Sequence, residues 1–331
     1  MIHREIGNSG LSTTAMGLGL AALGRPGYIN IGHAQDLNRS YAVKIMEENA
    51  HLVLDAAWAA GIRYFDAARS YGRAEHFLSS WLNNRGIEPN DVVIGSKWGY
   101  TYTAAWQIEA EHHEIKEHSS QVLSRQWQES NQLLSPYLDL YQIHSATLES
   151  GVLQNNEVLE GLAQIKSGGT RIGLSLSGPQ QAKTLYQAME IRVDGQALFD
   201  TVQATWNLLA QEAGEALNKA RQIGMGVIVK EALANGRLTD RNTEPLFMRK
   251  KGRLESIAAR YRTTIDALAL AVVLHQPWSD IVLSGAATVD HLQANVAAID
   301  LELGDEIEEL QDELREIPDQ YWSTRSQLAW N

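Results

Sequence analysis

The feature that most constrains the fold of this chain is an alternation of short apolar runs with longer amphipathic stretches, repeated eight times. The apolar runs are rich in β-branched residues and have the length of buried strands, while the stretches between them have helical spacing. The predicted strands are Met16–Leu20, Ile62–Asp66, Val92–Lys97, Asp139–His144, Arg171–Ser175, Thr201–Thr205, Gly226–Lys230 and Ile281–Ser284. The predicted helical stretches are Ala42–Ala60, Arg73–Asn84, Ser119–Leu134, Asn155–Ser167, Pro179–Met189, Gly214–Ile223, Leu254–His275 (two helices) and Val289–Ala298.

Eight strands that alternate with helices indicate an α/β fold with a parallel sheet, and the count favours a single (β/α)8 TIM barrel. An open, doubly wound sheet is the alternative. A further amphipathic helix is predicted at Gly304–Ile317, and the aromatic-rich tail 318–331 is expected to fold over the mouth of the barrel. Because no linker or low-complexity tract interrupts the pattern, residues 1–331 are taken as one domain.

Composition excludes several classes of protein. The formal charge of −12 disfavours nucleic-acid binding, which needs basic surface to meet phosphates. The chain has no cysteine, so disulfides, thiolate metal sites and cysteine nucleophiles are excluded. No apolar run approaches the ~18 residues that span a membrane, and no signal peptide is recognisable, so a cytoplasmic location is expected. The histidines around Glu114 have the spacing H-E-x-x-x-H, which favours a solvated loop, and no metal site is predicted.

Ionisable side chains end three successive predicted strands. The second, third and fourth strands end at Asp66, Lys97 and His144, and Tyr71 follows Asp66 by five residues, just before a helix. The C-terminal ends of neighbouring barrel strands share one rim, where barrel enzymes place their chemistry. Each residue alone could be an ordinary polar group of the rim, but the four together indicate a catalytic site.

These four side chains form a plausible proton-transfer group. A phenol, with a reference pKa near ~10, is a poor acid at neutral pH. The ammonium of Lys97 is expected to lower the pKa of Tyr71, while the carboxylate of Asp66 holds that ammonium in place. His144 would hydrogen-bond and orient a substrate oxygen. Tyr71 could then protonate the alkoxide that forms when a hydride reaches a carbonyl carbon.

Motif by motif, from Arg4–Leu11 to Asn295, the chain resembles the aldo-keto reductase superfamily. The resemblance implies a β-hairpin at Arg4–Ile6 and Ser12–Ala15 ahead of the barrel, and a catalytic tetrad of Asp66, Tyr71, Lys97 and His144. It also implies hydride transfer between NADP or NAD and a small-molecule aldehyde, ketone or sugar carbonyl, or the reverse reaction from an alcohol.

The resemblance further implies a set of cofactor contacts. Ser175 and Gln203 match carboxamide ligands, Leu233 matches a leucine near the pyrophosphate, and Lys230 stands where many members have an aromatic that stacks on nicotinamide. No basic residue stands at Ala286 or Ala287, so the preference between NADP and NAD is left open. The implied cofactor residues are Gly19, Asp66, Ser175, Gln203, Lys230, Leu233, Gly285, Ala287, His291 and Asn295.

Aromatic residues near the strand ends suggest a substrate wall. Trp98 and Tyr100 follow the third strand, and Tyr28 lies in the loop after the first, although loop packing would explain them as well. The alternative function is that of a regulatory protein that binds nucleotide on the same fold, in the manner of potassium-channel β-subunits. The lysine at the third strand speaks against a metal-dependent hydrolase, and the sequence gives no oligomeric state.

Overall fold

The computed structural model describes all residues, 1–331, and confirms the predicted barrel. Eight parallel strands close in the order β12-β13-β14-β3-β4-β5-β8-β9, so that sequence neighbours are also neighbours in space. Each strand overlaps one predicted from the sequence. The barrel strands are β3 (Met16–Gly19), β4 (Tyr64–Asp66), β5 (Val93–Trp98), β8 (Leu138–Ala146), β9 (Arg171–Leu176), β12 (Thr201–Thr205), β13 (Gly226–Lys230) and β14 (Ile281–Ser284).

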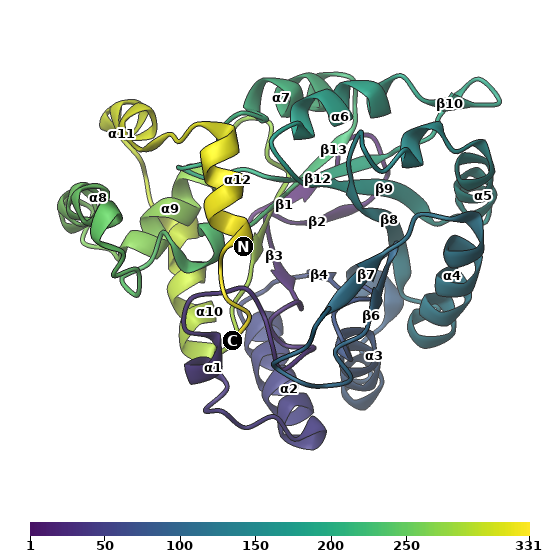
Figure 1. Ribbon diagram of the computed structural model, residues 1–331, viewed down its shortest axis with the longest axis horizontal. Helices are drawn as coiled ribbons and strands as arrows, with labels where there is room; N and C mark the ends of the chain where they lie inside the picture. Colours follow the sequence, from purple (N-terminus) through teal and green to yellow (C-terminus); the bar gives the residue numbers. More distant parts are fainter.

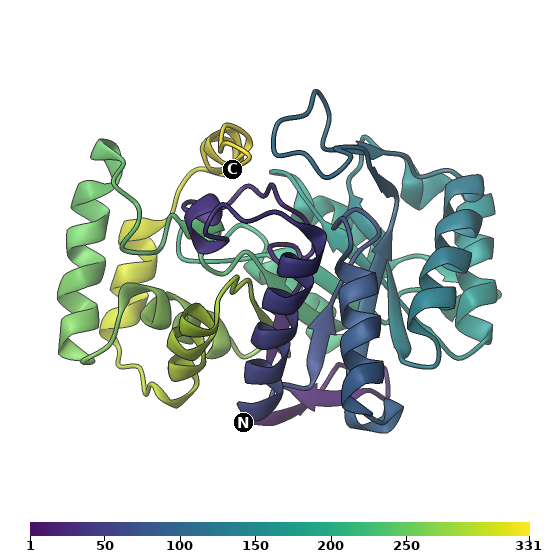
Figure 2. The same ribbon diagram turned by 90° about the horizontal axis from the view of Figure 1, so that it is seen from below.

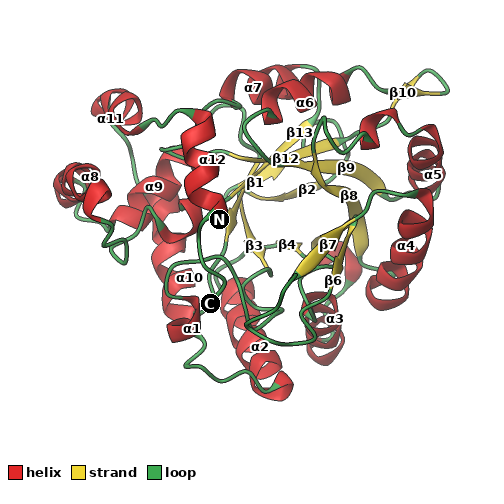
Figure 3. Ribbon diagram, viewed as in Figure 1, coloured by secondary structure: helices red, strands yellow, loops and turns green.

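A ring of helices surrounds the barrel (Figures 1 and 3). The main core lies between this ring and the strands, in one cluster of 81 buried hydrophobic residues. Helices α8 and α11 lie outside the ring and pack on each other. The helices are α2 (Val43–Ala59), α3 (Ala74–Arg85), α4 (Ser120–Leu134), α5 (Asn156–Ser167), α6 (Gln181–Met189), α7 (Gly214–Gln222), α8 (Met248–Arg260), α9 (Ile265–Leu274), α10 (Val289–Val296), α11 (Glu306–Leu314) and α12 (Pro318–Ser326).

The two ends of the barrel are closed differently. The hairpin of β1 (His3–Glu5) and β2 (Ser12–Thr14) covers the N-terminal end, and its connection places Ile6 against the barrel. A Cβ at Gly226 would lie only 2.4 Å from Ile6 Cγ2, so this close approach requires a glycine. Figure 2 shows the hairpin at the bottom, with α12 and the β6–β7 connection at the opposite end. The chemistry predicted from the sequence lies at that opposite end.

The structure adds elements between the strands and helices that the sequence predicted. Helix α8 begins at Met248, before the predicted helical stretch Leu254–His275, and the side chain of Thr264 caps the N-terminus of α9. Residues 98–118, after the third predicted strand, contain a small hairpin, residues 21–41, after the first, contain a short helix, and the tail contains helix α12. These segments are too short, or too polar, for hydrophobic periodicity to reveal them. The additional elements are α1 (His33–Asp36), β6 (Tyr100–Tyr102), β7 (Glu114–Lys116), β10 (Arg192–Val193) and β11 (Gln196–Ala197).

None of these helices is both long enough and apolar enough to cross a membrane.

Candidate active site

The barrel brings the four predicted catalytic residues together. Asp66 ends β4, Lys97 lies near the end of β5, and His144 lies near the end of β8. These three strands are adjacent in the sheet, in the order β4-β5-β8. Tyr71 lies in the turn between β4 and α3, and its hydroxyl lies 3.4 Å from the Nζ of Lys97.

Lys97 and Asp66 form a buried ion pair at the centre of this group. Their side chains are 0% and 2% exposed. The ammonium of Lys97 also donates to the carbonyl of Ala67 at 2.9 Å, and it contacts Tyr71. The second carboxylate oxygen of Asp66 accepts hydrogen bonds from Gln203 at 3.0 Å and from two further donors. Those two are Tyr64, at 3.3 Å, and Gln142, at 3.4 Å. The pair is therefore rigidly held and fully desolvated.

The structure contradicts the predicted effect of Lys97 on Tyr71. Burial, followed by the negative charge of Asp66, raises the pKa of Tyr71 well above its usual range. The physical reason is that Asp66 already neutralises the ammonium of Lys97, so desolvation of the phenolate dominates. Tyr71 is consequently held as a neutral phenol, which is the form that can donate a proton.

His144 faces the same cavity as a neutral imidazole. Burial, and after it the charges of Lys97 and Lys230, lower the pKa of His144 well below its usual range. Its Nδ1 lies 3.4 Å from the hydroxyl of Ser70, and its ring stands edge-on to Tyr71 at 5.4 Å between centroids. A neutral imidazole can hydrogen-bond a carbonyl oxygen beside Tyr71 without adding a charge.

A cavity of about 430 Å³ begins at these residues. It reaches from Tyr71 and His144 to His291 and Asn295 on α10. Most of the residues predicted to contact cofactor line it, and those residues are Gly19, Asp66, Gln203, Lys230, Leu233, Gly285, His291 and Asn295.

Two of the predicted cofactor residues do not line the cavity. Ser175 is fully buried, and its hydroxyl accepts a hydrogen bond from the backbone N–H of Ser145 at 2.8 Å. Ala287 is also buried, and its carbonyl accepts from Asn49 on α2 at 3.1 Å. The neighbouring Ala286 lines the cavity in its place.

The predicted substrate wall is only partly formed as expected. Tyr28 and Tyr100 line the cavity, but Trp98 does not. Trp98 is fully buried and packs edge-on against His118, with ring centroids 5.6 Å apart. The reason is strand alternation: Lys97 lies at the centre of the predicted catalytic group, so the next residue of β5 points to the opposite face of the sheet.

The sequence analysis missed a buried arginine beside Tyr71. The guanidinium of Arg25 lies 5.2 Å from the centre of the Tyr71 ring and 4.8 Å from that of Trp330. Its Nη1 donates to Glu114 at 2.9 Å and to the carbonyl of Ser70 at 3.1 Å. Arg25, Glu114 and Trp330 come from three separate segments without periodicity, so only an arginine in an otherwise apolar loop could have drawn attention to them.

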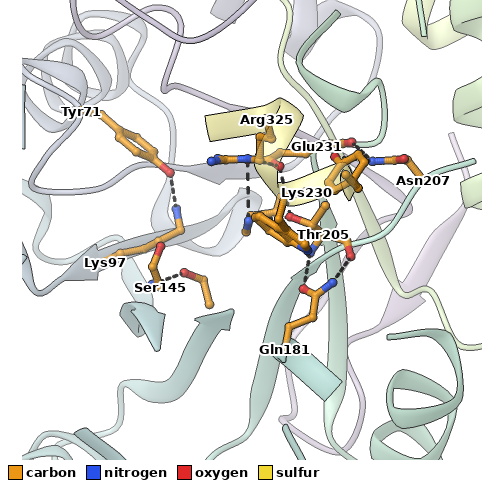
Figure 4. A network of polar contacts seen from close by, with 12 residues as sticks. Tyr71, Lys97, Ser145, Gln181, Thr205, Asn207, Lys230, Glu231 and Arg325 are labelled. Atoms are coloured by element: carbon orange, nitrogen blue, oxygen red, sulfur yellow. Dashed lines mark hydrogen bonds and ion pairs between the residues drawn. The ribbon is translucent and has the colours of Figure 1, made fainter. Parts of the chain in front are cut away.

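The sequence analysis also missed the partners around Lys230 that tie the C-terminal helix to the barrel mouth. Arg325 of α12 pairs with Glu231, which directly follows β13, and Nε of Arg325 lies 2.9 Å from Oε2 of Glu231. Lys230 donates to the hydroxyl of Thr205 at 2.8 Å and lies 3.8 Å from Glu231. Asn207 donates to the hydroxyl of Tyr321, also on α12, at 3.0 Å. Figure 4 shows this network beside the Tyr71–Lys97 pair.

The pairing of Glu231 predicts how acid affects stability. Although burial opposes it, the charges of Arg325 and Lys230 lower the pKa of Glu231 from 4.5 to about 2. A lowered folded-state pKa contributes stability that is complete above pH 4.5 and is lost as the pH falls toward 2. At neutral pH the contribution is on the order of 3 kcal/mol. Glu231→Gln should therefore be less stable than wild type at pH 7, and the difference should narrow between pH 5 and pH 3 in denaturant titrations. A difference that stays constant over this range would contradict the role of Glu231.

Comparison with known proteins identifies the family of this chain. The sequence model of the aldo/keto reductase family matches residues 15–316. Pyridoxal 4-dehydrogenase from Microbacterium luteolum is 23% identical, with 97% of this chain and 95% of that protein covered. The uncharacterized oxidoreductase YqkF of Bacillus subtilis is 26% identical, with 90% and 91% covered. The holo structure of the aldo-keto reductase AKR11C1 from Bacillus halodurans superposes with a TM-score of 0.73 at 20% identity, covering 97% of this chain and 99% of that one. Because the family match spans most of its length, this chain belongs to the aldo/keto reductase family of oxidoreductases.

Proposed function

We propose that this protein interconverts an aldehyde or ketone and the corresponding alcohol, using NADP or NAD, with Tyr71 as the general acid and base. The observation that carries the proposal is the position of the Tyr71 hydroxyl. It lies 3.4 Å from a fully buried ammonium, at one end of a cavity long enough to reach α10. The neutral imidazole of His144 lies beside the same phenol, so a proton donor, a fixed cation and a second hydrogen-bond donor meet at one point of the cavity.

The far end of the cavity fits a dinucleotide. Gly285 lines it, and a Cβ there would meet no atom within 4 Å, so a ribose or a phosphate has room. Asn235 also lines the cavity, and its buried Oδ1 has no hydrogen-bond partner within the protein. A buried, unpaired amide oxygen is costly unless a ligand pairs with it. When bound, a reduced nicotinamide would supply the hydride for the reaction.

The side chains at the end of the cavity that contains Tyr71 and His144 carry out the proton transfer. During reduction the carbonyl oxygen accepts hydrogen bonds from Tyr71 and His144, and the Tyr71 hydroxyl gives up its proton as the C–O group becomes an alcohol. Lys97 stabilises the phenolate that remains, because its ammonium is held within reach of that oxygen. In the oxidation direction the same phenolate removes the proton of the alcohol.

Tyr28, Tyr100 and Trp330 form an aromatic wall that suits an apolar or aromatic substrate. Pyridoxal should be among the first substrates tested, because a pyridoxal 4-dehydrogenase is one of the relatives of this chain.

Titration with NADPH and with NADH tests the proposal directly. Trp330 lines the cavity, so saturable quenching of tryptophan fluorescence is expected with at least one nucleotide. Arg241 lies 2.9 Å from His291 at the adenosine end, but its guanidinium is already paired with the buried carboxylate of Asp36. The ratio of the NADPH and NADH dissociation constants therefore decides between the two cofactors, because no unpaired cation at this end predicts a preference for the 2′-phosphate. A Trp330→Phe variant identifies the source of the signal. If a folded sample binds neither nucleotide, the proposed function is wrong; if it binds nucleotide tightly but turns over no carbonyl or alcohol, a regulatory role replaces catalysis.

A further inference from the structure

The charges at the catalytic end of the cavity do not cancel. Lys97 is paired with Asp66, and Arg25 is paired with Glu114. The third carboxylate, Glu231, is taken by Arg325, whose Nε and Nη2 both contact it. Lys230 is therefore left as a cation without a carboxylate of its own.

The ammonium of Lys230 is fixed inside the cavity wall. It donates to Thr205 at 2.8 Å, and its distance of 3.8 Å from Glu231 is longer than a hydrogen bond. The side chain is 16% exposed, so water screens it poorly. Burial lowers the pKa of Lys230 to about 8, which leaves the group largely charged at neutral pH while showing that its surroundings do not fully compensate the charge.

The charge of Lys230 acts at the reaction centre. It is one of the charges that lower the pKa of His144, after burial and Lys97. Hydride transfer requires the donor carbon within about 3–3.5 Å of the carbon whose oxygen contacts Tyr71 and His144. The nicotinamide ring must therefore lie inside the field of Lys230. That ring is neutral when reduced and carries one positive charge when oxidised.

We propose that Lys230 selects against the oxidised nicotinamide, so that the site binds the reduced cofactor more tightly than the oxidised one. This inference rests on the proposed function, because it needs a nicotinamide in the cavity. The coupling is purely electrostatic and is reciprocal. A cation that weakens binding of the positive ring also shifts the equilibrium on the protein toward reduced cofactor and carbonyl. Lys230 thereby favours oxidation of the alcohol in the bound state and release of the oxidised cofactor after reduction.

Dissociation constants of the two redox forms test this without measuring activity. Both forms of NADP are titrated against wild type, Lys230→Met and Lys230→Arg at pH 7, using fluorescence or calorimetry. Lys230→Met keeps the length of the side chain but removes its charge, and Lys230→Gln replaces it if the methionine variant does not fold. We expect the ratio of the oxidised to the reduced dissociation constant to fall roughly tenfold in Lys230→Met. In Lys230→Arg, which keeps the charge, the ratio should stay close to that of wild type.

The outcomes separate this inference from the proposed function. If wild type binds neither form, the proposed function fails and the inference fails with it. If wild type binds both forms and Lys230→Met weakens both equally, Lys230 contacts a part common to the two forms, and the inference alone is overturned. An unchanged ratio and unchanged affinities in Lys230→Met overturn it as well. If the ratio of the oxidised to the reduced dissociation constant falls as far in Lys230→Arg as in Lys230→Met, the effect is steric. That result also overturns the inference.

Discussion

Tyr71→Phe is expected to lower kcat for carbonyl reduction by roughly 10²–10⁴-fold, the usual contribution of a positioned general acid. The change removes only the hydroxyl that lies 3.4 Å from Lys97. The aromatic ring still packs against His144 and Arg25, so the cavity should keep its shape. Affinity for the nucleotide should therefore change little. Single-turnover measurement of hydride transfer, together with fluorescence titration of the nucleotide, checks both parts.

Tyr141→Phe is the matched control for this experiment. Tyr141 lies on the same strand as His144 and is fully buried, but it packs on Trp127 at 5.1 Å and does not line the cavity. Its replacement should leave kcat close to wild type. Equal turnover in Tyr71→Phe and wild type would remove Tyr71 from the mechanism. Loss of nucleotide binding in Tyr71→Phe would instead assign it a binding role.

The barrel and the position of the proposed catalytic group were predictable because both rest on strand alternation. Inward positions on parallel strands form a core, and the strand ends share one rim, so Asp66, Lys97 and His144 could be placed together before any coordinates. Trp98 shows the limit of this argument. It follows Lys97 by one residue and therefore faces away from the cavity, although its position after the proposed catalytic lysine suggests a substrate wall.

The other parts of the site depend on contacts between distant segments. Arg25 meets Glu114 across 89 residues of sequence, and Glu231 meets Arg325 across 94. Each of these charges looks like an ordinary surface residue when it is seen alone, because no periodicity relates the two partners. The protonation of Tyr71 was also beyond sequence reasoning, since it depends on how completely Asp66 neutralises Lys97 and on how deeply the phenol is buried.

The Asp66–Lys97 pair should be as important to folding as to catalysis. Asp66→Asn leaves a fully buried ammonium without a counter-charge, and this should lower the free energy of unfolding by about 3–5 kcal/mol. Lys97→Met should lower the free energy of unfolding by less, because Oδ1 of Asp66 keeps three hydrogen-bond donors, which are Tyr64, Gln142 and Gln203. In the double variant no unpaired charge remains. Its decrease in the free energy of unfolding should therefore be smaller than the sum of the decreases in the two single variants. Denaturant titration of the four proteins measures this coupling.

An exposed ion pair serves as the control that separates the effect of burial from the effect of removing a carboxylate. Glu313 lies 2.8 Å from Arg253, and the two side chains are 42% and 29% exposed. Glu313→Gln should cost less than about 1 kcal/mol because water screens the pair. If Asp66→Asn were as mild as Glu313→Gln, the ammonium of Lys97 would have to reach water or lose its proton. Either event would also remove the fixed cation that the phenolate of Tyr71 needs, so the same measurement tests the charge arrangement on which the proposed chemistry depends.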